Sequence, residues 1–208
     1  PLDGFVWVGT LGLGPSLLSV WSGLPVQSLK ELLAYEKANP GKLTLASSGG
    51  YAHFSSELFH HMSGMKLVVA IYKGGFPALV DTMAGQAQIN LGALLQSIPH
   101  MKSGKIRPLA TSGLRRAAAT PELPTIAESG LPGYDRSGWY GMVASSKVPR
   151  EIVVQLSGEL TKAVTHPETK ASLVKQGLDP YTNKPEEFAA YIKNEIAQNA
   201  KLIALAGV

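Results

Sequence analysis

The chain twice repeats one order of hydrophobic and polar positions: a short apolar run, a glycine turn, and a run with helical spacing. In the first copy, Leu43-Thr44-Leu45-Ala46 is apolar apart from its threonine, Ser47-Ser48-Gly49-Gly50 form the turn, and residues 52–62 have helical spacing. Short apolar runs bounded by turns are typical of buried strands, and amphipathic spacing is typical of helices. This stretch therefore predicts a strand, a tight turn and a helix.

The second copy is the most informative segment of the chain. Residues 67–71 are apolar, Tyr72-Lys73-Gly74-Gly75 follow, and residues 78–83 resume a helix-like apolar pattern. Pro77 suits the first turn of a helix, because its missing N–H would have no intrahelical partner there. Free backbone N–H groups at a helix start can hold an anion, and the lysine of this turn adds a positive charge.

Strand-like and helix-like segments alternate along the chain, which predicts an α/β fold with a mostly parallel sheet. Three Ser/Thr/Asn-x-x-Glu sequences predict helix starts at Ser28, Thr165 and Asn183. Residues 148–164 carry a helical apolar stripe. Residues 114–133 are rich in Pro, Gly and Ala, which predicts an irregular connection with a short turn near residues 125–129.

Composition narrows the class of protein without naming a function. The 208 residues suffice for one large or two small domains with a buried core. The chain has no cysteine, so disulfides and thiolate metal sites are excluded. No run is long and apolar enough to span a bilayer, and no signal segment opens the chain. The net charge of +4 is spread out, which favours a solvated basic surface over a nucleic-acid interface.

The two glycine turns predict one wall of a ligand site. Open α/β sheets bind ligands beyond the carboxyl ends of their strands, where both turns would lie. Serine hydroxyls and backbone N–H groups suit a carboxylate, because donors to an ionised acceptor make the stronger class of hydrogen bond. The alternative is that Gly49-Gly50 and Gly74-Gly75 serve only the turns, and that Lys73 is a solvated lysine.

A metal site on the first of these helices is disfavoured. His53, Glu57 and His61 share one helix face, with His60 beside them. Three ligands spread along a straight helix do not converge on one ion, so a polar face with Glu–His proximity is the better interpretation. We expect no metal and no cofactor.

Catalysis is also disfavoured. A hydrolase could combine Ser47 or Ser48 with His53 and Asp81. Both serines precede their glycines, however, so no Gly-x-Ser-x-Gly nucleophile elbow is present. We expect no catalytic residue.

Motifs through most of the chain carry a family resemblance. Beside the two glycine turns they are Leu24-Pro25-Val26, Ser28-Leu29-Lys30-Glu31-Leu32, residues 38–43, Glu57-Leu58-Phe59, residues 99–105, residues 122–134, Trp139-Tyr140-Gly141 and residues 185–189. In this order they resemble the substrate-binding proteins of tripartite tricarboxylate transporters, the Bug or TctC-like family. The segment at residues 122–134 is the strongest part of the match.

The resemblance implies a periplasmic-binding-protein-like flytrap: two α/β lobes joined by hinge strands, with a ligand in the cleft. On that map residues 22–138 form a continuous second lobe, and residues 1–21 with 139–208 belong to the first. Family members carry more chain before the point that matches Pro1. We therefore expect an N-terminally truncated chain whose first lobe is incomplete, with self-association through the surface around Phe5, Trp7 and the late helices.

The resemblance also implies which residues face the ligand, and it places His53 near the start of the ligand-facing helix. The expected ligand-binding residues are Ser47, Ser48, Gly49, Gly50, His53, Lys73, Gly74, Gly75, Pro77, Ala78, Gly92 and Ala93. For Trp139-Tyr140-Gly141 both a place in the cleft and packing at the hinge are open, and packing is favoured because aromatics beside a turn are more often core.

Two departures from the family pattern affect the ligand. The turn before His53 is shorter than usual. Gln88 and the pair Gly92-Ala93 stand where the family usually has an aspartate and another polar or acidic residue. We expect a less negative and roomier pocket, so the family's ligands cannot be carried over directly.

The function implied by the resemblance is capture of a small organic carboxylate in the periplasm for transfer to membrane permease subunits. A ligand sensor that presents the carboxylate to a receptor or sensor kinase is the alternative, because the same fold serves both. An enzyme is the third and disfavoured interpretation.

Overall fold

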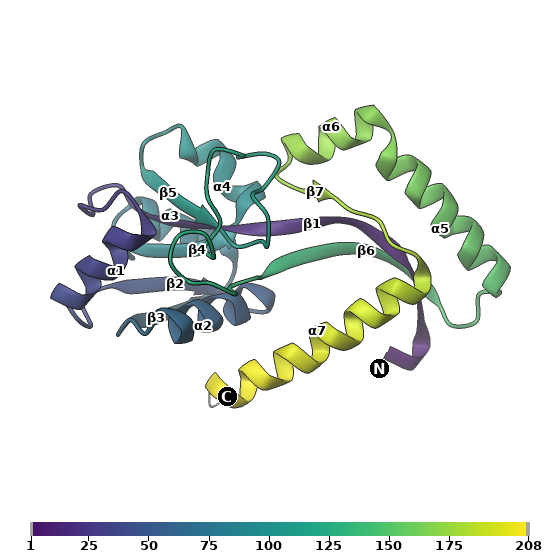
Figure 1. The fold of residues 1–208 in the computed structure, drawn as a ribbon, viewed down its shortest axis with the longest axis horizontal. Helices are drawn as coiled ribbons and strands as arrows, with labels where there is room; N and C mark the ends of the chain where they lie inside the picture. Colours follow the sequence, from purple (N-terminus) through teal and green to yellow (C-terminus); the bar gives the residue numbers. More distant parts are fainter. Residues whose placement is uncertain (1, 207–208) are drawn as a thin grey trace. The chain divides into compact units, whose positions relative to one another are not determined.

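The computed structural model describes residues 2–206 (Figure 1). They fall into two compact units: Pro1–Gly14 with Trp139–Val208, called unit 1, and Pro15–Gly138, called unit 2. The sequence-based division assigned residues 15–21 to the other part of the chain. They pack with unit 2 because strand β1 (Phe5–Trp21) continues through them and pairs there with strands of unit 2.

The sheet of unit 2 has the strand order β3-β2-β4-β1-β5. Its further strands are β2 (Thr44–Ser48), β3 (Val68–Tyr72), β4 (Ile89–Ala93) and β5 (Ile106–Thr111). β2 pairs in parallel with β3 and β4, as predicted. β1 is antiparallel to both β4 and β5, so the sheet is mixed rather than mostly parallel.

Helices cover both faces of this sheet. α1 (Leu29–Ala38) and α2 (Tyr51–Ser63) pack with Leu18 and Leu45, whereas α3 (Gly75–Met83) and α4 (Leu94–Met101) pack with Leu17. Consecutive residues of a strand point to opposite faces, so these two helix pairs lie on opposite sides. The predicted helix after each glycine turn is confirmed.

Unit 1 consists of the 3₁₀ turn η1 (Leu2–Gly4), the first part of β1 and the C-terminal segment. β6 (Ser137–Ser145) and β7 (Asp179–Pro180) pair with β1, and the helices are α5 (Arg150–Thr165), α6 (Pro167–Lys175) and α7 (Pro185–Ala206). Phe188 lies against both Trp7 and Trp139, each with ring centroids 5.2 Å apart. The prediction that Trp139 packs is therefore confirmed. The expected self-association remains a prediction.

One of the three predicted capping boxes is correct. Ser28 caps α1, where its Oγ accepts a hydrogen bond from the Glu31 N–H at 3.2 Å. Thr165 instead ends α5, and its hydroxyl donates to the Thr161 carbonyl. Asn183 accepts from the Thr10 N–H, and the Lys184 N–H is bound by Glu187. The last two predictions were wrong because the side chains have other partners.

Ser112 joins the two points at which the chain enters and leaves unit 2. Its N–H donates to the Ser16 carbonyl at 2.9 Å, and its Oγ accepts from the Ser16 N–H at 2.8 Å. Its Oγ also donates to the carbonyl of Arg136, whose N–H donates back to Ser112 at 2.8 Å. One buried serine thus holds Ser16 and Arg136 beside each other.

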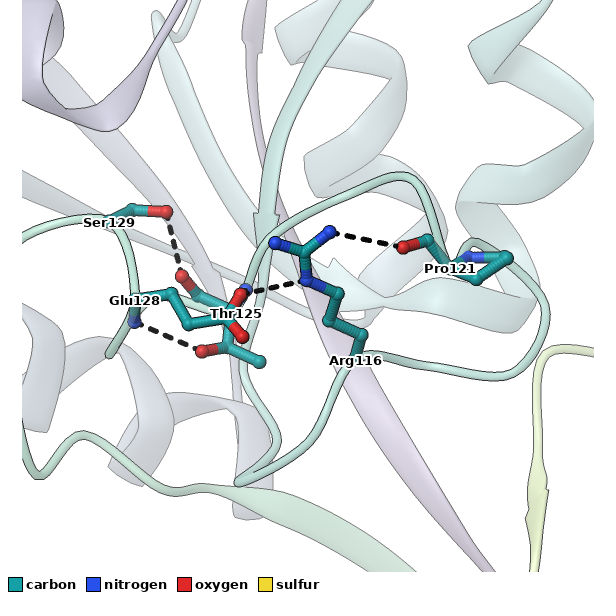
Figure 2. A network of polar contacts seen from close by, with 5 residues as sticks. All are labelled: Arg116, Pro121, Thr125, Glu128 and Ser129. Atoms are coloured by element: carbon teal, nitrogen blue, oxygen red, sulfur yellow. Dashed lines mark hydrogen bonds and ion pairs between the residues drawn. The ribbon is translucent and has the colours of Figure 1, made fainter.

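The irregular connection after β5 is ordered by a polar network (Figure 2). The Thr125 N–H donates to Glu128 at 3.0 Å, and the Glu128 N–H donates back to the Thr125 hydroxyl. Arg116 pairs with the same carboxylate at 2.9 Å. The Thr125 N–H and then Arg116 hold the pKa of Glu128 below its usual value. The turn predicted near residues 125–129 is confirmed.

Among the described residues, every helix is too short or too polar to cross a membrane.

Candidate functional site

The carboxyl ends of β2, β3 and β4 lie at one edge of the unit 2 sheet. β2 and β3 end level with each other, since Ser48 is the register partner of Tyr72. β4 runs in the same direction and ends at Ala93, opposite Ser16 of β1. The strands of the two predicted strand–turn–helix units are therefore neighbours that end side by side.

Three helices begin at this edge, and none has a side-chain cap from its N-cap residue. The N-cap residues are Gly50 for α2, Gly74 for α3 and Ala93 for α4. Gly50 has φ +70° and Gly74 has φ +150°, both of which favour glycine. The first backbone N–H groups of a helix lack intrahelical partners and attract anions. The edge therefore offers three such groups of donors.

β2 and β4 are neighbouring strands whose helices leave to opposite faces of the sheet. α2 follows β2 on one face, and α4 follows β4 on the other. In open α/β sheets ligands bind at the crevice created by this reversal. Ser47-Ser48 and Gly92-Ala93 lie on its two sides.

The first turn is partly closed by its own side chains. Ser47 is 0% exposed, and its Oγ lies 3.4 Å from His53 Nδ1. The same nitrogen lies 3.9 Å from a Glu57 oxygen. A catalytic triad uses one imidazole nitrogen toward the nucleophile and the other toward the acid, so this arrangement does not form one.

The second turn is more open. Lys73 is exposed, and no neighbour lies closer than 3.7 Å to the position of a Cβ on Gly74. The Tyr72 side chain hydrogen-bonds Asp81 of α3, and burial followed by this contact raises the pKa of the phenol. This contact joins the end of β3 to the later part of α3.

All twelve predicted site residues fall at this edge, but they differ in access. Gly49, Gly50, Lys73 and Pro77 are exposed. Ser47 and Ala78 are fully buried, and Ala78 packs on Ala46 below the edge. The side chains of these two residues are therefore shut off from solvent at the edge.

Gln88 lies away from this edge. It precedes β4, where its Oε1 accepts from the Thr44 N–H at 3.0 Å and its Nε2 donates to the Gly85 carbonyl. The departure from the family pattern at this position therefore concerns the pairing of β2 and β4. The expectation that Gln88 changes the pocket was wrong, because Gln88 bonds to Thr44 at the amino ends of β2 and β4.

Two carboxamides at the edge were missed from the sequence. Gln96 of α4 places its Oε1 2.5 Å from where a Cβ would lie on Gly75, and Asn90 places its Oδ1 2.6 Å from the corresponding position on Gly92. An asparagine between Ile89 and Leu91 in a buried strand was a usable signal for the second. Nothing in the sequence marks Gln96, because its contact depends on how α3 and α4 pack.

The described part of the chain has no group of three His, Asp or Glu side chains placed to hold a metal ion.

Comparison with known proteins agrees with this geometry. The family described as "Tripartite tricarboxylate transporter family receptor" matches residues 3–208. Protein BugT of Bordetella pertussis is 29% identical over 99% of this chain and 64% of BugT. A Pseudomonas sp. protein encoded between tcbD and tcbE is 32% identical over 91% of this chain and 57% of its own length. The chain thus spans less than two thirds of these relatives.

Solved structures give the same result. An R. palustris protein described with adipate is 33% identical and has a TM-score of 0.89, with 100% of this chain and 70% of that chain covered. The periplasmic binding protein BugD is 29% identical with a TM-score of 0.83, and the match covers 98% of this chain and 70% of the BugD chain. These matches confirm the resemblance found in the sequence and the periplasmic-binding-protein-like fold. They also agree with the choice of a binding protein over an enzyme.

Proposed function

The chain belongs to the tripartite tricarboxylate transporter receptor family, and on that basis we propose that it is a periplasmic solute-binding protein for a small organic carboxylate. The observation that carries this proposal is the convergence of three uncapped helix starts at one sheet edge. The adipate named with the R. palustris relative supports a carboxylate as the ligand.

The residues of this edge would each make a different contact with the bound carboxylate. Backbone N–H groups after Gly50 and Gly74 would donate to the carboxylate oxygens, because glycine leaves room for the ligand to approach. Ser48 would add a hydroxyl donor, and Lys73 a positive charge. Buried Ser47 would hold His53 in place through its contact with Nδ1. None of these steps changes a covalent bond.

The bound carboxylate would then pass to the membrane permease subunits of a tripartite tricarboxylate-type transporter. This part of the proposal rests on the family description.

A thermal-shift screen of the 208-residue chain tests the proposal. Adipate, malate, citrate, benzoate and an amino acid would be compared, and titration calorimetry would follow on every compound that raises Tm. A ligand at 100 times its Kd stabilises the folded state by about 2.7 kcal/mol, which is readily measured. Adipamide is the matched control, since it keeps the chain length and removes both charges.

We expect one or more carboxylates to raise Tm and adipamide to have no effect. The proposal fails if every carboxylate leaves Tm unchanged, or if adipamide binds as well as adipate does.

A further inference from the structure

Asn90 is a buried polar residue in the middle of an apolar strand. It is 2% exposed, and its neighbours Ile89 and Leu91 belong to the core. Its Oδ1 accepts no hydrogen bond from any residue that the structure describes. A buried acceptor without a donor is costly, so such groups normally have a partner from outside the protein fold.

The orientation of the Asn90 amide is determined by its other end. Its Nδ2 lies 3.4 Å from the Ala46 carbonyl of β2. Exchanging the amide oxygen and nitrogen would bring two acceptors together, so the nitrogen belongs on that side. The oxygen therefore points along β4 toward the position that a Cβ of Gly92 would occupy, one residue before the N-cap of α4.

A second unpartnered group lies opposite. Ser19 of β1 is the register partner of Asn90, and its fully buried Oγ also has no hydrogen-bond partner among the described residues. Register partners place their side chains on the same face of a sheet, with Cβ atoms roughly 5 Å apart. A free acceptor thus lies beside a hydroxyl that can donate.

These two groups together favour one kind of ligand group. A hydroxyl can donate to Asn90 Oδ1 and accept from Ser19 at the same time. An ammonium group could donate to both oxygens, but it would bring a positive charge with it. None of the twelve residues of the expected ligand wall is acidic, so nothing there would neutralise an ammonium charge.

We propose that Asn90, with Ser19, is a specificity-determining residue that selects carboxylates bearing a hydroxyl group. This inference rests on the proposed function, because the hydroxyl must belong to a ligand whose carboxylate is held at the same edge. The ligand class is a hydroxy-dicarboxylate rather than a plain dicarboxylate.

Matched ligand pairs that differ by one hydroxyl test the inference. Titration calorimetry would compare malate with succinate, and 2-hydroxyadipate with adipate. In the parent chain we expect the hydroxylated member of at least one pair to bind roughly tenfold more tightly, as for a neutral hydrogen bond. Asn90→Leu, which is similar in shape, should remove this preference while the plain dicarboxylate binds as before. Ser19→Ala should reduce it in part.

Thr120→Val is the control, since it removes another buried hydroxyl, outside the strand edge, that has no hydrogen-bond partner among the described residues. It should leave the preference unchanged. If Asn90 binds only a buried water, Asn90→Leu should change Tm but not the ratio of the two ligand affinities. That result would overturn the inference. Equal affinities within both pairs in the parent chain overturn it as well, although the proposed function then survives. If no carboxylate binds at all, both the proposed function and this inference fail.

Discussion

The two glycine turns at the sheet edge have nearly the same sequence pattern but differ in what surrounds them. At the end of β2, Ser47 points inward to His53, and a Cβ on Gly49 or Gly50 in the following turn would meet no neighbour. In the turn after β3, Lys73 points outward, and Gln96 covers Gly75. A shared pattern of glycines thus predicts a shared backbone turn but not equal roles in binding. Four predictions test this difference, beginning with the largest expected effect.

We expect Gly74→Val to cause the largest loss. A β-branched residue at φ +150° is strained, which should lower the free energy of unfolding by about 1–3 kcal/mol. The new side chain would also occupy the approach to the first N–H groups of α3. Urea unfolding measures the first effect, and calorimetric titration of a carboxylate measures the second.

Gly104→Val is the matched control, because Gly104 has φ +69° and lies just before β5, away from the site. It should lose stability and keep full affinity. Unchanged affinity in Gly74→Val would show that this glycine serves only the turn.

Ser48→Ala should weaken carboxylate binding by about 1.5–3 kcal/mol, the usual range for a hydrogen bond to a charged group. Ser47→Ala should instead lower the free energy of unfolding by about 0.5–1.5 kcal/mol, because its buried hydroxyl contacts His53 rather than solvent. Calorimetry and urea unfolding of both variants separate the two roles. A larger loss of carboxylate affinity in Ser47→Ala than in Ser48→Ala would contradict the roles assigned to the two serines.

Gly50→Ala and Gly49→Ala differ only in backbone conformation. Gly50 has φ +70° and ψ −138°, so an alanine should cost about 1–3 kcal/mol of stability. Gly49 has no positive φ and open space at its Cβ, so an alanine should change stability by less than about 0.5 kcal/mol. Thermal unfolding of the two variants measures the difference, and an equal loss in both would contradict the role assigned to the backbone at Gly50.

Lys73→Ala should have the smallest effect, a loss of about 0.2–1 kcal/mol in carboxylate affinity, since solvent screens an exposed charge. The loss should decrease when calorimetry is repeated in high salt. Lys105→Ala is the control, because Lys105 is also exposed but precedes β5 at the other end of the sheet. A loss in Lys73→Ala that does not depend on salt would argue against a purely electrostatic role.

The sequence predicted what depends on local pattern. Both strand–turn–helix copies are present, with β2 at Thr44–Ser48 and β3 at Val68–Tyr72, one or two residues from the predicted bounds. α1 begins directly after Ser28, as its capping box predicted.

The sequence failed where a residue's role depends on a distant partner. β1 lies antiparallel between β4 and β5, which no local pattern of its residues specifies. Asn183 matches a helix cap in sequence but bonds to Thr10, far along the chain. Gln96 became a candidate only once helix packing placed its carboxamide beside Gly75.

Ser112 bears on the order in which the chain folds during its synthesis. Unit 2 is one continuous stretch, Pro15–Gly138, and it can fold before the ribosome has made the rest. Unit 1 is discontinuous and must wait for its C-terminal segment. Because Ser112 holds residues 16 and 136 together, a folded unit 2 has already closed the long loop that separates the two pieces of unit 1. The entropic cost of closing that loop is therefore already met when unit 1 begins to assemble. We expect unit 2 to form first and to speed the folding of unit 1.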